Sequence, residues 1–272
     1  MNILDKIIET KKIEVEKRKE ECPIAELENS MFFNRPTLSL KKYLEDPTKT
    51  GIIAEFKRQS PSKGMINGNV LVQDVTKGYE KAGASACSIL TDKEYFGGEN
   101  KDVAAARTSL SIPILRKEFI IDEYQIVEAK SIGADVILLI AAVLEPARLR
   151  KLAEFAKFLG LEVLMEVHNE KELLDNCCEV DIIGVNNRNL KDFSVSIETS
   201  IKLAELIPGR YFKISESGIY DAETIVKLKE HGFQGFLIGE NFMRKENPGQ
   251  EMEKFVASLH KLESEHKRIK PV

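Results

Sequence analysis

Short apolar segments rich in branched residues recur along the chain, and a longer amphipathic segment separates most of them from the next. Each apolar segment has the length of a strand, and several are apolar at almost every position, as is typical of strands covered on both faces. The pattern predicts eight strands, at 52–56, 86–90, 112–115, 136–140, 161–165, 182–185, 211–214 and 235–238.

The segments between the strands carry apolar residues at spacings of three and four with charged residues between them, which predicts helices. Gly83, Gly133, Gly160 and Gly232 stand near the ends of such segments, where a left-handed residue commonly ends a helix. The predicted helices are 72–81, 122–131, 146–159, 197–206, 222–231 and 251–262.

The centres of successive strands lie 20 to 34 residues apart, which leaves room for one helix and two short loops in each interval. Alternation of strands and helices predicts a parallel sheet, and eight such units fit a (β/α)8 TIM barrel. An open doubly wound sheet is the alternative. It more often has five or six strands and a Gly-x-Gly-x-x-Gly turn after the first strand, and this chain lacks that motif.

About 50 residues precede the first predicted strand, and the start of this segment has the pattern of an amphipathic helix. We therefore expect residues 1–272 to form a single barrel domain, with residues 1–50 as a helical extension packed on the barrel. The apolar positions that predict the helix are Ile3, Leu4, Ile7, Ile8, Ile13 and Val15.

The composition is that of an ordinary globular protein, with 43% hydrophobic and 31% charged residues among 272. The 40 basic and 44 acidic residues are dispersed along the chain, so we expect no nucleic acid and no membrane surface as partner. The longest apolar run, 136–144, is too short to cross a bilayer, and the first residues do not form a secretory signal. These features predict a cytoplasmic protein.

Cys22, Cys87, Cys177 and Cys178 contain no Cys-x-x-Cys pair, so we expect reduced, mostly structural thiols. The sequence also lacks a Walker loop, His-Glu-x-x-His and Gly-x-Ser-x-Gly, and its four histidines are scattered. His168 directly follows a predicted strand, a place from which it could touch the site, but it is interpreted as a surface loop residue. We therefore expect a reaction that uses no metal and no cofactor.

Polar residues follow several predicted strands at their carboxyl ends, where a barrel of this kind carries its active site. Any one of them is also typical of a capping or solvated charge, but several strands converge on one mouth. Because side chains alternate along a strand, Glu55 and Lys57 are expected on one face, and Glu166 continues the face of Leu164. Lysine and glutamate side chains gathered in a partly dry pocket favour general acid–base catalysis. These residues are Glu55, Lys57, Lys117, Glu166, Asn186, Arg188, Glu216 and Ser217.

Two glycines suggest a phosphate site. Gly218 follows the seventh predicted strand and Gly239 the eighth, and barrels commonly bind phosphate in these two loops through backbone N–H groups. Lys57 and the loop that begins at Ser60 lie at the same end of the barrel and add a cation and hydroxyl groups. Without further evidence, both glycines are also compatible with ordinary turns.

Six segments resemble, in the same order, the signature segments of the indole-3-glycerol phosphate synthase family. They are IAEFKRQSPSKG at 53–64, LTDKEYFGG at 90–98, LRKEF at 115–119, MEV at 165–167, GVNNRNL at 184–190 and SESGI at 215–219. The resemblance covers nearly the whole chain. It implies a carboxy-lyase of tryptophan biosynthesis that closes 1-(2-carboxyphenylamino)-1-deoxyribulose 5-phosphate to indole-3-glycerol phosphate, with loss of carbon dioxide and water.

The resemblance also implies roles for the polar residues. Lys117 matches the catalytic lysine that acts as the acid at the carbonyl oxygen, Glu166 is the base, and Lys57 is a further acid or an anion contact. Glu55 would position and tune the lysines, and Asn186 and Glu216 would contact the sugar hydroxyls.

By the same resemblance, the apolar walls around the anthranilate ring are Phe96, Phe119, Leu138 and Leu190. Ser60 would lie near the substrate carboxylate, with Arg188 and Ser217 as further substrate contacts. The phosphate would bind at Lys57, Gly218, Gly239 and Glu240. Because a carboxylate repels phosphate, Glu240 would serve only through its backbone N–H, with its side chain turned away.

Two other classes of function remain as alternatives. One is another phosphosugar barrel: phosphoribosylanthranilate isomerase would use a Cys/Asp pair, and a ribulose-phosphate epimerase would need metal ligands. The other is a catalytically silent barrel that binds a phosphorylated ligand or a partner, which the intact Lys57, Lys117 and Glu166 argue against. We expect a monofunctional chain. Closure of the segment 60–69 as a lid is a hypothesis, which Gly64, Gly68 and the polar residues between them suggest but the sequence does not decide. The sequence leaves open any contact with other tryptophan-pathway enzymes.

Overall fold

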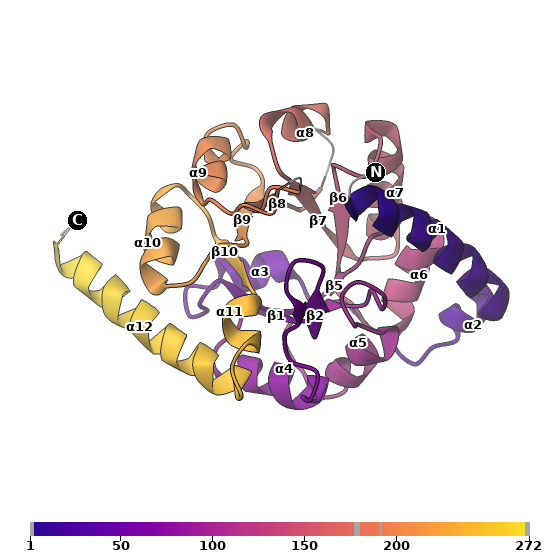
Figure 1. Cartoon of the computed structure of the whole chain (residues 1–272), viewed down its shortest axis with the longest axis horizontal. Helices are drawn as coiled ribbons and strands as arrows, with labels where there is room; N and C mark the ends of the chain where they lie inside the picture. Colours follow the sequence, from indigo (N-terminus) through magenta and orange to yellow (C-terminus); the bar gives the residue numbers. More distant parts are fainter. Residues whose placement is uncertain (1–2, 177–179, 191, 270–272) are drawn as a thin grey trace.

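Eight parallel strands pair side by side into a closed barrel in the computed structural model, which describes residues 3–176, 180–190 and 192–269 (Figure 1). This architecture confirms the predicted (β/α)8 barrel and excludes the open sheet. In chain order the barrel strands are β1 (Ile52–Phe56), β4 (Ala86–Leu90), β5 (Ile114–Lys117), β6 (Val136–Ile140), β7 (Glu162–Val167), β8 (Ile182–Asn186), β9 (Phe212–Glu216) and β10 (Gly235–Ile238). β10 pairs with β1 and closes the ring.

Helices surround the barrel (Figure 1). The six predicted helices are present, and the described residues add three short ones that the sequence pattern did not predict, α5, α8 and α11. The four glycines expected to end helices all have positive φ, from 77° to 95°. The surrounding helices are α4 (Val72–Lys81), α5 (Asn100–Arg107), α6 (Glu123–Ser131), α7 (Pro146–Phe158), α8 (Glu170–Asp175), α9 (Glu198–Ala204), α10 (Ala222–Glu230), α11 (Glu240–Met243) and α12 (Pro248–Ile269).

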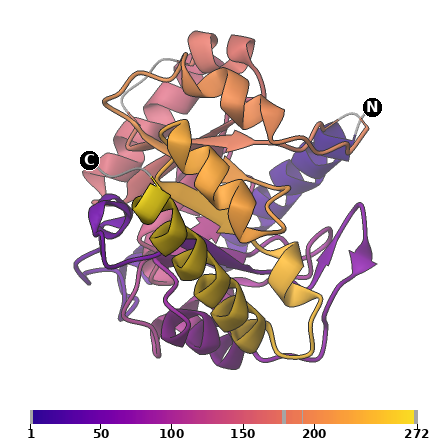
Figure 2. The same cartoon turned by 90° about the vertical axis from the view of Figure 1, so that its left-hand side faces the viewer.

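The hydrophobic core has two parts. A larger cluster fills the space between the strands and the surrounding helices, and a smaller one fills the barrel interior. Helix α3 (Leu40–Glu45) adds Leu40 and Leu44 to the inner cluster, where they join Ile53 and Ala86, so it closes one end of the barrel. At the opposite end project the hairpin β2 (Gln59–Ser60) and β3 (Gly64–Met65) and the first residues of α1 (Ile3–Glu21) (Figure 2).

Four strands, β5, β7, β8 and β9, extend further toward their carboxyl ends than the apolar pattern predicts. Lys117, Glu166 and Glu216 were expected to follow the strands, but each is paired in the ladder, with Leu90, Ile140 and Asn186 respectively. Hydrophobicity ends before the backbone pairing does, because the last inward-facing residues of these strands meet the site instead of the core. The sheet therefore fixes the backbone of Glu166 and Glu216 on both sides and that of Lys117 on the side of β4.

The N-terminal segment forms α1 followed by the short α2 (Ile24–Glu28). The buried line on α1 is Ile7, Lys11 and Val15, at spacings of four that keep one face of a helix inward. The expectation that Ile13 packs inward was wrong: its side chain is 74% exposed, since it lies on the other side of the helix from Val15.

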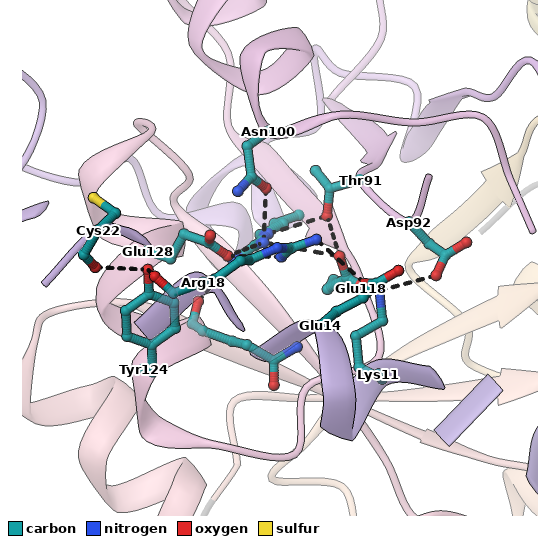
Figure 3. A network of polar contacts seen from close by, with 12 residues as sticks. Lys11, Glu14, Arg18, Cys22, Thr91, Asp92, Asn100, Glu118, Tyr124 and Glu128 are labelled. Carbon is teal, nitrogen blue, oxygen red and sulfur yellow. Dashed lines mark hydrogen bonds and ion pairs between the residues drawn. The ribbon is translucent and has the colours of Figure 1, made fainter. Parts of the chain in front are cut away.

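A buried ion network joins α1 to the barrel (Figure 3). The ammonium of Lys11 lies 2.9 Å from Asp92 Oδ2, 3.0 Å from Glu118 Oε1 and 2.7 Å from Glu14 Oε2. Further along the helix, Arg18 Nη1 lies 3.2 Å from Glu128 Oε2 of α6. These contacts hold the helix so that its first residues reach the open mouth of the barrel.

Cys22 is partly buried and Cys87 buried, and both are free thiols. Cys177 and Cys178 lie outside the described residues. Within the part of the chain that the structure describes, no helix has the length and apolar composition needed to cross a bilayer.

The Lys11 contacts predict a large stability loss on substitution. Lys11→Ala leaves Asp92 and Glu118 buried without their shared cation, and removing one partner of a buried ion pair costs about 3–5 kcal/mol. Urea unfolding at pH 7 measures this loss. The control is Lys12→Ala on the exposed side of the same helix, which should change the free energy of unfolding by about 0.5 kcal/mol or less. Equal losses in both variants would contradict the network's importance.

Candidate active site

A cavity opens at the carboxyl ends of the barrel strands, and the predicted site residues gather around it. Its empty volume, which includes space open to solvent, is about 1030 Å³. The predicted residues that line it are Glu55, Lys57, Ser60, Phe96, Lys117, Phe119, Leu138, Glu166, Asn186, Arg188, Leu190, Glu216, Ser217 and Glu240. Gly218 and Gly239 line an adjoining pocket that shares Lys57 and Arg188 with it.

The floor of the cavity is a layer of charged side chains from alternate strands of the barrel. In a closed parallel barrel, alternate strands supply each interior layer, and inward positions on one strand are two residues apart. The charged layer consists of Glu55 from β1, Lys117 from β5, Glu166 from β7 and Glu216 from β9. Two residues earlier on each strand stand the apolar residues of the inner core, Ile53, Leu115, Leu164 and Ile214.

Lys117 holds the charged layer together. Its Nζ lies 3.0 Å from Glu166 Oε2 and also contacts Glu216 Oε2. Beside this group, Lys57 Nζ lies 3.0 Å from Glu55 Oε1, which fits the prediction that these two side chains share a face of β1. The charged layer and the neighbouring Lys57 thus bring two ammonium groups together with three carboxylates.

Two glycines, which have no side chain, make room for two of these carboxylates. A Cβ atom at Gly239 would lie 2.6 Å from Glu55 Oε1, and one at Gly184 would collide with Glu216 Oε1. Such distances are far shorter than real Cβ contacts. Both glycines therefore serve a close approach of side chains, and any larger residue would push a carboxylate out of the layer.

The shared lysine separates the acidities of two carboxyls. Burial alone would raise the pKa of Glu166, but the charges of Lys117 and His168 outweigh burial and hold it well below the usual range. Burial, together with the charges of Glu166 and Glu55, outweighs Lys117 at Glu216 and raises its pKa to about 7. Burial opposes the charge of Lys117, yet the surrounding carboxylates hold its pKa above the usual range. The site therefore offers an ionised carboxylate, a charged ammonium and a carboxyl that titrates near neutrality.

The interpretation of His168 as a surface loop residue was wrong. Its side chain is only 8% exposed, and its Nε2 lies 3.3 Å from Glu166 Oε1. The strand β7 continues to Val167, so the histidine stands at the strand end, directly beside the cavity floor. Its place two residues after Glu166 is the signal that could have revealed this contact.

One side of the cavity is apolar. The rings of Phe96 and Phe119 lie 5.9 Å apart, and Leu138 is buried in the inner core beneath them. Sequence reasoning missed the part that α1 contributes, since Ile3, Leu4 and Ile7 also line the cavity. It also missed Phe193, which has a positive φ of 60°. Hydrophobic periodicity cannot show that a helix a hundred residues away in sequence covers the same cavity.

The opposite side is polar and is built from the loops after β9 and β10. Ser217 and Gly218 have consecutive positive φ values, 67° and 77°. Glu240 carries two cationic partners: Arg188 Nη2 lies 3.7 Å from Oε2, and Arg244 contacts Oε1. Glu240 lines both pockets, and the two arginines hold its carboxylate; that its side chain turns away from a phosphate stays a prediction. Among the residues described, no group of histidine, cysteine and acidic side chains has the arrangement of a metal site.

Comparison with known proteins identifies the family. Residues 4–255 match the family model described as indole-3-glycerol phosphate synthase. The chain belongs to the indole-3-glycerol phosphate synthase family. The protein of that name from Bacteroides thetaiotaomicron is 45% identical over 258 residues, which are 95% of this chain and 99% of the relative. The one from Campylobacter fetus is 46% identical over 246 residues, covering 90% and 95%.

A solved structure supports the fold independently. A chain of the tryptophan synthase α2β2 complex of Pyrococcus furiosus superposes with a TM-score of 0.57 at 16% identity, over 79% of this chain and 99% of that one. Family membership makes this protein a carboxy-lyase that acts on a small phosphorylated substrate. It also agrees with the barrel cavity, which combines an apolar wall, acid–base groups and glycine loops.

The raised pKa of Glu216 predicts a pH dependence of stability. Because its pKa is about 7 when folded and 4.5 ordinarily, this group makes the free energy of unfolding fall as the pH rises from about 4.5 to 7. Glu216→Gln removes that fall, while Glu166 titrates below this window. The difference in unfolding free energy, variant minus wild type, should rise by roughly 3 kcal/mol across it.

Urea unfolding at pH 5 and pH 8 measures this change. Glu205→Gln, at the exposed residue that follows α9, is the control and should show no such trend. A difference between Glu216→Gln and wild type that does not vary with pH would contradict the assignment.

Proposed function

We propose that the charged layer and the two sides of the cavity convert 1-(2-carboxyphenylamino)-1-deoxyribulose 5-phosphate to indole-3-glycerol phosphate, carbon dioxide and water. The observation that carries this proposal is the buried Lys117, whose ammonium contacts the carboxylates of Glu166 and Glu216 on the floor of a half-apolar cavity. Such a group supplies an acid and a base within reach of one substrate.

Substrate binding follows the two sides of the cavity. The anthranilate ring packs against Phe96, Phe119, Leu138 and Leu190, and burial of an aromatic ring there provides much of the affinity. Ser60, Arg188 and Ser217 contact the polar part of the substrate, with Ser60 nearest its carboxylate.

The phosphate binds on the polar side, at Lys57 and the backbone N–H groups around Gly218, Gly239 and Glu240. The ion pairs of Glu240 with Arg188 and Arg244 reduce the repulsion that its carboxylate would exert on the phosphate. Asn186 and Glu216 then face the sugar hydroxyls, and Glu216, with its pKa near neutrality, can donate or accept a hydrogen bond.

Ring closure needs an acid. The ring carbon that bears the carboxylate attacks the ketone carbon, and Lys117 gives a proton to the ketone oxygen as that bond forms. Loss of carbon dioxide returns its bonding electron pair to the ring and restores aromaticity. Glu55 and the other carboxylates keep Lys117 charged before the transfer, which is the form that an acid requires.

Dehydration needs a base and an acid. Glu166 takes a proton from the carbon beside the nitrogen, the electron pair forms the new double bond, and the hydroxyl leaves as water with a proton from Lys57. The low pKa of Glu166 keeps it ionised, and Glu55 holds Lys57 at 3.0 Å. No external oxidant or reductant is needed, because the sum of the steps is substrate to product plus carbon dioxide and water.

We further propose that the chain works as one barrel domain with residues 1–50 as an extension that contributes to the cavity wall, and that the segment 60–69 closes over the bound ligand. Ser60, Pro61 and Ser62 line the cavity, which supports the second idea. The cytoplasmic location and the absence of nucleic-acid partners stay predictions.

A fluorescence assay tests the function directly. Mixing the purified protein with the carboxyphenylamino-deoxyribulose phosphate, without added metal or cofactor, should give rising indole fluorescence. Lys117→Met should lower kcat by about 10²-fold or more, because it removes the acid, while the exposed Lys101→Met should match wild type. Turnover that survives Lys117→Met would refute the assignment of the acid. A folded wild type without turnover would favour another phosphosugar substrate or a silent barrel.

A further inference from the structure

His168 stands directly after β7, and its imidazole lies between two carboxylates. Nε2 lies 3.3 Å from Glu166 Oε1, and Nδ1 lies 3.0 Å from Glu172 Oε2 on α8. The side chain is 8% exposed, so both contacts are largely shielded from water. Neither the proposed acid–base steps nor the predicted site residues use this histidine.

Glu172 is itself fixed in place. Its Oε2 also accepts a hydrogen bond from the backbone N–H of His168 at 2.8 Å, and its Oε1 accepts one from Asn169 Nδ2 at 2.6 Å. Asn169 in turn caps α8 by accepting from the backbone N–H of Glu172. The start of α8 therefore forms a rigid cradle that sets the orientation of the imidazole ring.

The other end of this chain of contacts is the proposed base. Glu166 presents Oε1 to His168 and Oε2 to Lys117, so its two oxygens face two different cationic groups. The contact with His168 is one of opposite charges and not a hydrogen bond, since Nε2 has no hydrogen-bond partner among the described residues. An imidazolium there favours the orientation of Glu166 that turns Oε1 toward the ring while Oε2 faces the acid.

The charge balance of the cavity floor also favours a positively charged His168. Glu55, Glu166 and Glu216 carry up to three negative charges, against which Lys57 and Lys117 supply two positive ones. The imidazolium of His168 would be the third. Burial lowers the pKa of His168, but Glu166 and Glu172 outweigh burial and raise it to about 10. Asp5 and Arg188, which carry opposite charges, line a neighbouring pocket together with His168 and Glu172.

We propose that His168 is a positioning residue, a cation that orients the Glu166 carboxylate and keeps it ionised for proton abstraction. This inference rests on the proposed role of Glu166 as the base. Glu172 is part of this arrangement, because it contacts the ring of His168 and favours the charged form of the imidazole.

A titration tests the charge state without any turnover. In protein labelled with ¹⁵N-histidine, the His168 resonances are identified as those that His168→Gln removes. Both ring nitrogens should carry protons at pH 7.5, and Glu172→Gln should shift the titration of His168 to lower pH. A His168 ring that is neutral at pH 7.5 would overturn the proposal, whether or not the protein turns over the substrate.

Kinetics test the effect on the base. An opposite charge at this distance commonly lowers a carboxyl pKa by one unit or more, so His168→Leu should move the acidic limb of kcat up by about one pH unit. His168→Gln should do the same, so that its loss of kcat is confined to the acidic limb of the profile, with KM changed by less than about twofold. The deficit should shrink as the pH rises, because Glu166 ionises again.

A purely structural role would instead lower kcat equally at every pH, in step with a lower melting temperature. Glu172→Gln should reproduce the shift of the acidic limb in weaker form, and His231→Gln, far from the cavity, should behave as wild type. A pH profile of His168→Leu that superposes on the wild-type profile would overturn the proposal. Wild-type protein without turnover would refute the proposed function alone, since the ¹⁵N titration still measures the imidazolium.

Discussion

Burial of a lysine ammonium among carboxylates at the top of the barrel is the interaction on which the site depends. An isolated ion in that place would be neutralised, because transfer of a charge out of water is expensive unless partners surround it. Lys117 has two such partners within contact distance, Glu166 and Glu216. The barrel makes this possible by aligning the ends of alternate strands, so that four charged residues form one layer directly above an apolar one.

This arrangement divides the carboxyls into different chemical roles. Glu166 lies between two cations and stays ionised, while Glu216 shares its cation and faces other negative charge, so that its pKa rises to about 7. Residues of the same type thus acquire different acidities from their surroundings alone. Gly184 and Gly239 belong to the same design, because only the absence of a side chain leaves room for the carboxylates to approach the lysines.

The same stretch of chain also connects the site to the N-terminal helix. Consecutive residues at the end of β5 alternate in direction: Lys117 points into the barrel, while Arg116 and Glu118 point outward, where Arg116 pairs with Glu128 and Glu118 with Lys11. Lys11 thereby docks α1, whose first turns form part of the cavity wall. The packing of the N-terminal extension and the position of the proposed acid, Lys117, are therefore coupled through the consecutive residues 116–118.

The sequence by itself determined the eight strands, most of the surrounding helices, the closed barrel and the residues that gather at its mouth. Periodicity and strand parity are local properties, and parity alone placed Glu55 with Lys57 and Glu166 above Leu164. The tertiary structure decided what depends on distant partners. Lys11 and not Ile13 is buried against the barrel, and His168 is buried beside Glu166. Lys117, Glu166 and Glu216 still belong to their strands. Those outcomes follow from charge pairing across the fold, and a linear pattern of hydrophobicity carries no information about which charges will meet.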